Sequence, residues 1–378
     1  MVKAFLSPVY SPFRLLLGAI FVIISFVTTY FSFPSDVPPQ TGVQYTKIPK
    51  GVWILYSGTF GNPENDSRWI HWRYPKGEYS NDWYEPPLNV PSLTYPQLGL
   101  YSSHDESVIR THCQQISEAG IEAIILCWWG KNSTDRFLDD TDGYSDKTME
   151  LLLKIAPEFK LKVGIQIQPH QKRNATVVVE EIQYILDKYA TNPNYLTVNK
   201  RPVIIIYEFF SIKDAKLTCN QFKNNPYIIG SVTQKSDIAS NLENCMEAMF
   251  TYFAAIDTTW SSKTKEWEGV SKDVRSRGLA FIPGIGPGHD RGKVDHWNKA
   301  ERSRESGKYY RDRWEDAIRV KADTIIINSF NNWVDNSHIE PAVNRSGFEF
   351  SHRSWAEANN PDLYLEITRN YSVKYLYS

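Results

Sequence analysis

Short apolar runs alternate with amphipathic, helix-like stretches along most of this chain. The apolar runs are nearly continuous in Ile, Val, Leu and aromatic residues, a pattern typical of strands buried on both faces of a parallel sheet. They predict strands at Val52–Tyr56, Glu122–Cys127, Lys162–Ile167, Val203–Tyr207, Tyr227–Val232, Ala248–Phe253, Leu279–Pro283 and Thr324–Ile327.

The helix-like stretches lie between most of these strands. We expect helices at Asp105–Ala119, Asp146–Pro157, Val177–Tyr189, Ile212–Phe222, Ile238–Cys245, Lys263–Arg277 and Tyr310–Ala322, and a last one at Ser354–Tyr371. Eight strands that alternate with helices indicate an α/β fold, a closed (β/α)8 barrel of the TIM type. An open doubly wound sheet is the alternative, but the sequence has neither GxGxxG nor a Walker P-loop to support it.

The N-terminal region predicts a membrane anchor. Residues 15–33 carry no charged side chain and are long enough to span a bilayer as a helix. Lys3 and Arg14 precede this run and no acidic residue occurs before Asp36, so we expect a cytoplasmic tail at 1–14, a transmembrane signal-anchor at 15–33, a lumenal stalk at 34–50 and a lumenal barrel at 51–378. A cleaved signal peptide is the alternative, although no Ala-x-Ala-like site follows.

Composition adds little about partners. The net charge is -1, which gives no electrostatic reason to expect nucleic acid. The cysteines form no CxxC pair and no zinc spacing, and we expect no metal and no cofactor. Cys219 and Cys245 could pair in an oxidising lumen. Glycosylation sequons begin at Asn65, Asn132, Asn174, Asn344 and Asn370, which mildly supports a lumenal location.

The barrel rule selects candidate site residues, because active sites of such barrels lie at the carboxyl ends of the strands. Amides, carboxylates and indoles there suit a polyhydroxylated ligand. The substrate-binding candidates are Tyr56, Trp128, Gln166, Gln168, His170, Arg173, Tyr252 and Trp333.

Some rim residues have a structural interpretation as well. Of Trp128 and Trp129 only one can point inward, and both could be core; Glu208 could be a paired structural carboxylate; His289 has no identifiable partner. The long connection from Ser57 to His104 is either a covering loop that packs on itself or an aromatic rim for an extended ligand.

The loop after the last predicted strand carries the densest chemistry. It reads Asn-Ser-Phe-Asn-Asn-Trp-Val-Asp-Asn-Ser-His-Ile-Glu from Asn328 to Glu340. Sugar hydrolysis usually needs two carboxyl groups, one that protonates the leaving oxygen and one that acts at the opposite face. Asp335 and Glu340 are the candidates.

Many separated motifs resemble one family. They are Gly61–Pro63, Trp69–Trp72, Tyr95–Ser103, Gln168–Pro169 with Arg173, Thr251–Ala254, Pro283–Gly288, Gly307–Tyr310, Ser329–Asn331 and Leu363–Arg369. Together, over about Gly51 to Tyr375, they resemble glycoside hydrolase family 99, the endo-α-1,2-mannosidases of the Golgi. The resemblance implies a (β/α)8 barrel, a retaining α-mannosidase acting on high-mannose N-glycans, and a type II Golgi membrane protein with a lumenal catalytic domain.

The chain departs from the family pattern where catalysis is expected. The family reads Phe-Asn-Glu-Trp-His-Glu-Gly-Thr-Gln-Ile-Glu after its last strand. The resemblance places the base that acts on the substrate 2-hydroxyl at Asn332 and the general acid at Asp335, while Glu340 is unchanged. On the third strand, His-Ile-Gln-Pro-Tyr becomes Gln166–His170. Asp335 can still donate a proton, but an amide at Asn332 cannot accept one near neutral pH.

Three hypotheses follow. The first is a Golgi α-mannosidase with impaired turnover, in which Asp335 is the acid and Glu340 or a substrate group replaces the base. The second is a catalytically inactive, lectin-like protein that binds mannose glycans in the secretory pathway. The third is a glycosidase with a different glycan specificity.

Overall fold

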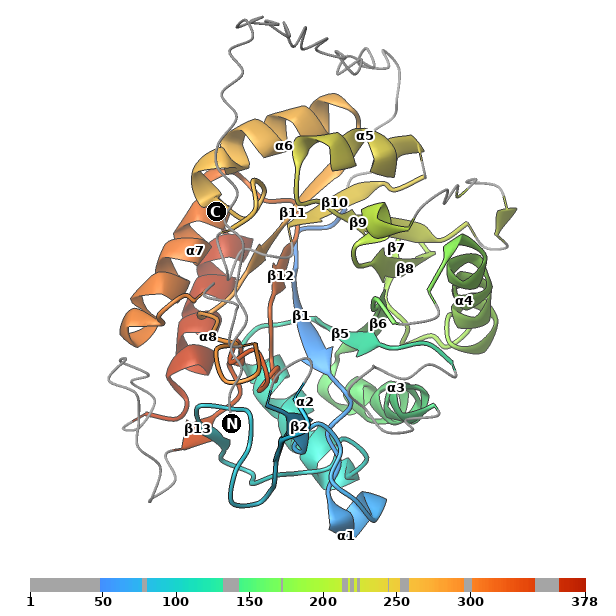
Figure 1. The fold of residues 1–378 in the computed structure, drawn as a ribbon. Helices are drawn as coiled ribbons and strands as arrows, with labels where there is room; N and C mark the ends of the chain where they lie inside the picture. The colour runs from blue at the N-terminus through green and yellow to red at the C-terminus, as the bar shows by residue number, and fades with distance from the viewer. Residues whose placement is uncertain are drawn as a thin grey trace, which may run out of the picture. The chain divides into compact units, whose positions relative to one another are not determined.

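Eight parallel strands close into a barrel in the computed structural model (Figure 1). The hydrogen-bonded order is β6-β5-β1-β12-β11-β10-β9-β8, and pairing of β6 with β8 completes the circle. The strands are β1 (Val52–Ser57), β5 (Ala123–Trp128), β6 (Lys162–Ile167), β8 (Arg201–Ile206), β9 (Tyr227–Ser231), β10 (Ala248–Thr251), β11 (Ala280–Ile285) and β12 (Ile325–Ile327). All eight predicted strands and the TIM-type barrel are confirmed, and the open sheet is excluded.

The structure describes part of the chain. The described residues are 48–76, 80–131, 143–170, 173–212, 217, 221–222, 225–243, 245–251, 258–295, 301–343 and 360–378. They belong to one compact unit, Pro38–Ser378. The predicted anchor at 15–33 lies outside them. Among the described residues, the longest apolar helices fall short of what a bilayer crossing requires.

Helices surround the strands, as Figure 1 shows. They are α2 (Glu106–Glu118), α3 (Tyr144–Ile155), α4 (Ala175–Lys188), α5 (Lys235–Glu243), α6 (Trp267–Ser276), α7 (Lys308–Arg319) and α8 (Leu363–Leu376). Each matches a predicted helix within a few residues, except that α8 begins later and extends beyond the predicted end. Of the predicted helix Ile212–Phe222, the described residues are Ile212, Leu217, Gln221 and Phe222, and none of these four is assigned to an α-helix; a 3-10 turn, Phe209–Ser211, precedes them.

Side chains alternate between two cores along every strand, because successive residues of a strand point to opposite faces. One core fills the barrel with residues such as Trp53, Ile125 and Ile205. The other lies between the strands and the helices and includes Ile54 and Ile124. Position along a strand therefore decides whether a side chain can reach the barrel mouth.

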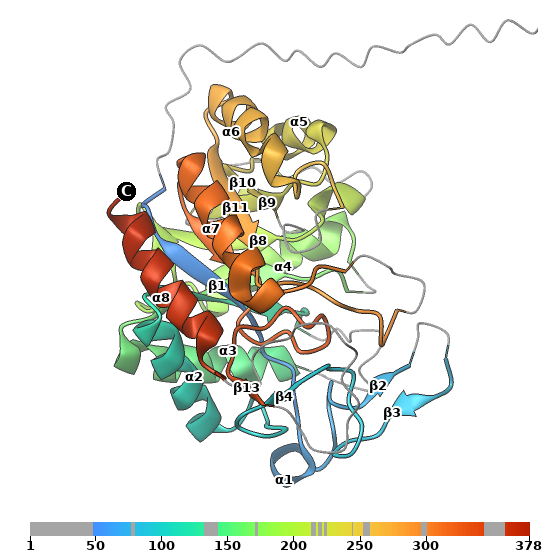
Figure 2. The same ribbon diagram turned by 90° about the vertical axis from the view of Figure 1, so that its left-hand side faces the viewer.

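The long first connection packs on itself over one end of the molecule. It contains α1 (Pro63–Asp66), the antiparallel pair β2 (Tyr74–Pro75) and β3 (Trp83–Tyr84), and β4 (Tyr95–Pro96), which pairs with β13 (Ala342–Val343). Figure 2 shows these elements gathered at that end. Phe60 stacks on the fully buried Trp72 with ring centroids 4.2 Å apart. For Trp72, a covering loop is the correct interpretation.

The structure shows the bonding state of three cysteines and the exposure of three sequon residues. Cys113 and Cys127 are free, and Cys245 is disulfide-bonded. Cys219 lies outside the described residues, so its pairing with Cys245 stays a prediction. The sequon residues Asn65, Asn174 and Asn370 are exposed.

Candidate active site at the barrel mouth

The loop from Asn328 to Glu340 is fixed to the barrel near its start and is closed on itself near its end. Phe330 N–H donates to the Leu55 carbonyl of β1 at 2.8 Å, and Ile339 N–H donates to the carbonyls of Ser329 and Phe330 at 3.0 and 2.9 Å. The two arms of the loop therefore lie side by side, and the residues between them are presented by a rigid support. Such a loop can hold catalytic or binding groups in place.

Asn332 and Asp335 are hydrogen-bonded to each other inside this loop. Asn332 Nδ2 donates to Asp335 Oδ2 at 2.7 Å, and Asp335 N–H donates to Asn332 Oδ1 at 3.1 Å. Asn332 N–H also donates to Ser329 Oγ at 2.8 Å. The amide is therefore held by its neighbours on both its oxygen and its nitrogen.

Arg291 pairs with the other oxygen of Asp335. Its guanidinium donates to Asp335 Oδ1, and its Nε donates to Asp295 Oδ2 at 2.7 Å. Burial by itself would raise the pKa of Asp335, but the charge of Arg291, the nearby His289 and the hydrogen bonds from Arg291 and Asn332 outweigh it and lower that pKa. Asp335 is therefore a carboxylate at neutral pH, the form that accepts a proton and cannot donate one.

Polar groups from other strands face the same space. Gln168 Nε2 donates to Gln166 Oε1 at 2.7 Å, and the Cys127 sulfur lies 3.7 Å from that oxygen. Burial raises the pKa of the Cys127 thiol to about 12, and the charge of Asp335 adds to the rise. The predicted candidates Gln166 and Gln168 are thus on the inner face, as expected.

Three buried polar atoms at these strand ends have unused hydrogen-bonding capacity. They are Gln166 Nε2, His289 Nε2 and Asn328 Oδ1, for which the described part of the chain supplies no hydrogen-bond partner. Burial lowers the pKa of His289, so its ring stays neutral near pH 7. Buried polar atoms in native proteins are usually satisfied, so unsatisfied ones near a site suit a polar ligand.

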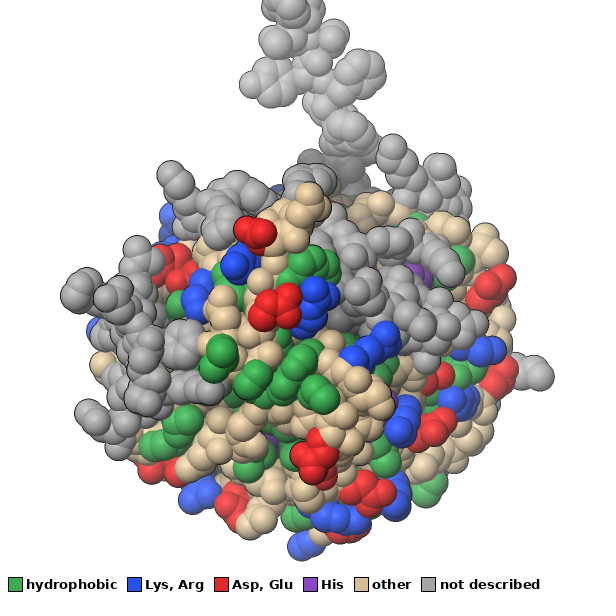
Figure 3. Space-filling view, turned by 60° about the horizontal axis from the view of Figure 1, so that its bottom comes forward, with side chains coloured by type: hydrophobic (Ala, Val, Ile, Leu, Met, Phe, Trp, Pro, Cys, Tyr) green, Lys and Arg blue, Asp and Glu red, His purple; other side chains and the backbone are tan. Residues whose placement is uncertain are grey.

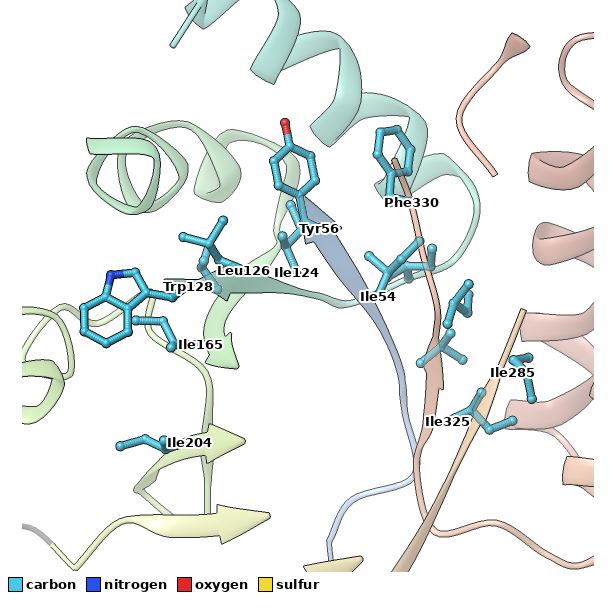
Figure 4. Packing of buried hydrophobic residues seen from close by; sticks show 14 of the residues in the cluster. Ile54, Tyr56, Ile124, Leu126, Trp128, Ile165, Ile204, Ile285, Ile325 and Phe330 are labelled. Carbon is cyan, nitrogen blue, oxygen red and sulfur yellow. The ribbon is translucent and has the colours of Figure 1, made fainter. Parts of the chain in front are cut away.

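Tyr56 and Trp128 do not face the barrel mouth, which corrects the prediction for both. They share the outward-facing alternation of Ile54 and Ile124, and Figure 4 shows them projecting from their strands on the side of the helices. Trp128 Nε1 donates to Asp146 Oδ1 at 2.7 Å, behind the strand. The strand alternation could have shown this, since Cys127 and Trp129 occupy the inward register instead.

Glu340 and Trp333 are part of the interior, so neither is available to a ligand in this structure. Glu340 Oε2 accepts from Tyr101 Oη and Trp333 Nε1, both at 2.8 Å, and Oε1 lies 3.1 Å from His112 Nε2. The Tyr56 hydroxyl lies 2.9 Å from the other nitrogen of His112. All five side chains are almost fully buried. The expected catalytic role of Glu340 is replaced by a structural one: it joins the loop, α2 and the first connection.

The residues after β6 have structural partners too. His170 Nε2 lies 2.8 Å from Glu181 Oε1 of α4, and both side chains are buried. Arg173 donates to the carbonyls of Tyr207 and Glu208. The sugar-contacting role expected of His170 and Arg173 is therefore not supported: one is turned toward a helix and the other holds the loop after β8. Tyr252 lies outside the described residues.

In the part of the chain that the structure describes, neither metal ligation nor the cavity beside α1 involves the predicted site residues. Within the described residues, no group of three His, Cys, Asp or Glu side chains could hold a metal ion. A cavity of about 640 Å³ lies between α1, β4 and β13, lined among others by Trp69, Pro87 and Gln97. Figure 3 shows hydrophobic side chains grouped on the side that carries α1 and β13. None of the predicted site residues lines this cavity.

Arg291 is the site residue that the sequence analysis missed. It follows β11 by six residues, and its sequence position gives no sign that it meets a loop more than forty residues away. The usable signal was chemical: a buried aspartate at a mouth needs a cation, and Arg291 follows the expected rim residue His289.

The comparisons with known proteins agree with the fold. The model of Glycosyl hydrolase family 99 matches residues 48–377. The chain belongs to this family. It is 30% identical to the glycoprotein endo-alpha-1,2-mannosidase of Mus musculus over 349 residues, which cover 85% of this chain and 74% of the relative.

One further relative and one solved structure extend the comparison. The glycoprotein endo-alpha-1,2-mannosidase-like protein of Homo sapiens is 28% identical, over 88% of this chain and 78% of that protein. The structure of the GH99 endo-alpha-mannosidase from Bacteroides thetaiotaomicron superposes with a TM-score of 0.77 at 29% identity, over 87% of this chain and 98% of that one. The expected family is therefore confirmed, and the roles of Asn332 and Asp335 stay predictions.

Proposed function

We propose that this chain is a glycoside hydrolase of the endo-α-1,2-mannosidase type that acts on N-linked high-mannose glycans with retention. The observation that carries the proposal is the position of Asp335: it lies on a rigid loop at the barrel mouth of a family 99 chain, among polar groups with spare hydrogen-bonding capacity. In this role its protonated form gives a proton to the leaving oxygen while the substrate 2-hydroxyl oxygen attacks the anomeric carbon from the opposite face and loses its proton to water. A second water then attacks the anomeric carbon from the side of the leaving group, gives a proton to the Asp335 carboxylate and restores the starting configuration, and the 2-oxygen regains a proton from water.

We expect slow turnover. Asn332 cannot remove a proton from a sugar hydroxyl, and a missing general base costs roughly 10²–10⁴-fold in rate. Asn332 still offers a hydrogen-bonding amide, so binding is retained better than catalysis. Since Glu340 is enclosed by three donors, it does not replace the missing base.

The test uses the full chain and a glucosylated high-mannose N-glycan. Released oligosaccharide is measured by mass spectrometry beside equilibrium binding of the same glycan. Slow release in the wild type, and loss of release in Asp335→Asn with binding retained, supports hydrolysis. Release that persists in Asp335→Asn contradicts the role of Asp335.

A mannose-glycan-binding protein without turnover is the second candidate. Two observations favour it: the amide at Asn332 and the ion pair that holds Asp335 ionised. Binding in the absence of any release by the wild type, at every pH tested, selects this function.

We also propose that the chain is a single-pass type II protein of the Golgi membrane with its barrel in the lumen. The charge-free run at 15–33 and the sequons support this location. Protease protection of the barrel in sealed Golgi vesicles, together with glycosidase-sensitive mobility, tests it. Digestion of the barrel in intact vesicles would overturn it.

A further inference from the structure

Arg291 occupies a built position against the site loop. Asp290 N–H donates to the Asp335 carbonyl at 2.9 Å, and Asn336 Nδ2 donates to the Asp290 carbonyl at 2.7 Å. His289 exchanges two backbone hydrogen bonds with Arg302, at 3.0 and 2.8 Å. The segment that carries Arg291 is therefore tied to the site loop through Asp290 and to Arg302 through His289, and the guanidinium does not reach Asp335 by chance rotation of an exposed side chain.

The ion pair is largely removed from water. The side chains of Arg291 and Asp335 are 24% and 15% exposed. Charge interactions at such sites are screened less by salt than those between exposed pairs. Asp335 therefore has donors for both oxygens, Arg291 on one and Asn332 on the other.

These contacts disfavour the protonated form of Asp335, which the proposed reaction needs. Every donor that stabilises the Asp335 carboxylate disfavours its protonated form. We propose that Arg291 is a positioning residue that holds Asp335 ionised and thereby limits how often this site can protonate a leaving group. The inference rests on the proposed function, and it adds a determinant of rate outside the substituted family positions.

The charged and titratable groups near Asp335 determine whether removal of the Arg291 charge raises or lowers the pKa of Asp335. Arg291 and His289 lower the pKa of Asp335. The Cys127 thiol on β5 stays protonated because burial raises its pKa to about 12. Asp295 shares Arg291 from the far side. Removing the Arg291 charge thus removes the main cationic influence, and the pKa of Asp335 rises.

The first arm of the test is a pH–rate profile of glycan hydrolysis by the full chain. Arg291→Gln keeps a hydrogen-bond donor without charge, and Arg291→Lys is the matched variant that keeps the charge. A protonated acid is lost as pH rises through its pKa, so the alkaline fall in rate should move up by about 1–3 pH units in Arg291→Gln. Each unit raises the rate roughly tenfold on that limb. Arg291→Lys should keep the limb near the wild-type position.

The second arm does not depend on turnover. The Tm difference between each protein and its Asp335→Asn counterpart is measured against pH, once in the wild-type background and once in the Arg291→Gln background. An Asp whose folded pKa is depressed stabilises the fold above its unfolded pKa, and this is lost as pH falls through the folded value. Removal of the Arg291 charge raises the folded pKa of Asp335 toward its unfolded value, so the pH-dependent loss of Tm should be smaller, and should end at higher pH, in the Arg291→Gln background. A loss of equal size in both backgrounds overturns the inference. No hydrolysis in any variant, with a smaller loss in the Arg291→Gln background, refutes the proposed hydrolysis but retains the role of Arg291.

Discussion

Two carboxylates of one loop, Asp335 and Glu340, have opposite surroundings although only five positions separate them in the sequence. Glu340 is enclosed by Tyr101, Trp333 and His112, whose donors it satisfies inside the protein. Asp335 is at the mouth and is matched by one full positive charge, that of Arg291. A carboxylate surrounded by immobile donors is a structural junction. A carboxylate at the mouth, whose donors are Arg291 and Asn332 and whose neighbours include polar atoms with spare hydrogen-bonding capacity, can change its protonation state, and we therefore propose Asp335 as the catalytic carboxylate.

The strongest test of this comparison restores the family residues on the Asp335 side. The double variant Asn332→Glu/Asp335→Glu should raise hydrolysis of the glucosylated glycan by roughly 10²–10⁴-fold, because it returns a base and lengthens the acid. Initial rates of released oligosaccharide measure the effect. The single variant Asp335→Glu is the control for reach alone. An unchanged rate in the double variant would indicate that the substituted positions Gln166 in β6 and His170 after β6 limit turnover.

A second test removes the negative charge of Glu340. Glu340→Gln leaves at least one buried donor facing an amide nitrogen, and the free energy of unfolding should fall by about 3 kcal/mol. Urea unfolding measures it, with the exposed Glu64→Gln as the matched control. A stability equal to that of the wild type would show that the buried donors find other partners, and the contrast with Asp335 would fail.

The pH dependence of stability sharpens the contrast through His338. Its ring stacks on Trp333 with centroids 3.8 Å apart, and burial, aided by the charge of Arg304, lowers its pKa well below 6.5. The unfolded chain then binds this proton more readily, so stability is full above the unfolded pKa and falls as pH drops below it. His338→Gln should flatten the decline of Tm between about pH 7 and pH 5. An equally steep decline in the variant would assign the loss to other groups.

The smallest expected effect concerns Tyr56. Tyr56→Phe removes one buried hydrogen bond to His112 and should lower the free energy of unfolding by about 1 kcal/mol. Glycan affinity should stay unchanged, because the ring lies on the helix side of β1. A matched measurement on Gln166→Ala, an inner-face residue, should show weaker glycan binding. Weaker binding by Tyr56→Phe as well would return Tyr56 to the site.

Much of the fold was accessible from the sequence, because strands and helices leave local periodic signals. The runs at Lys162–Ile167 and Tyr227–Val232 needed no distant information to be assigned as strands. The loop Asn328–Glu340 was also identified, since the carboxyl end of a barrel strand has a defined place in the fold. The errors concerned which face of a strand a side chain occupies. Tyr56 and Trp128 stand at strand ends, but their side chains point outward, toward the helices.

The amino-acid sequence by itself determined the barrel, the family and the loop that carries Asn332 and Asp335, because these depend on local pattern and on motifs read in order. Only the tertiary structure decided that Glu340 is enclosed by donors of the protein interior and that Asp335 is paired with a cation at the barrel mouth. That decision depends on Arg291, His112 and Tyr101, which come from distant parts of the chain, and Coulombic and hydrogen-bond energies depend on distances in space that sequence separation does not encode.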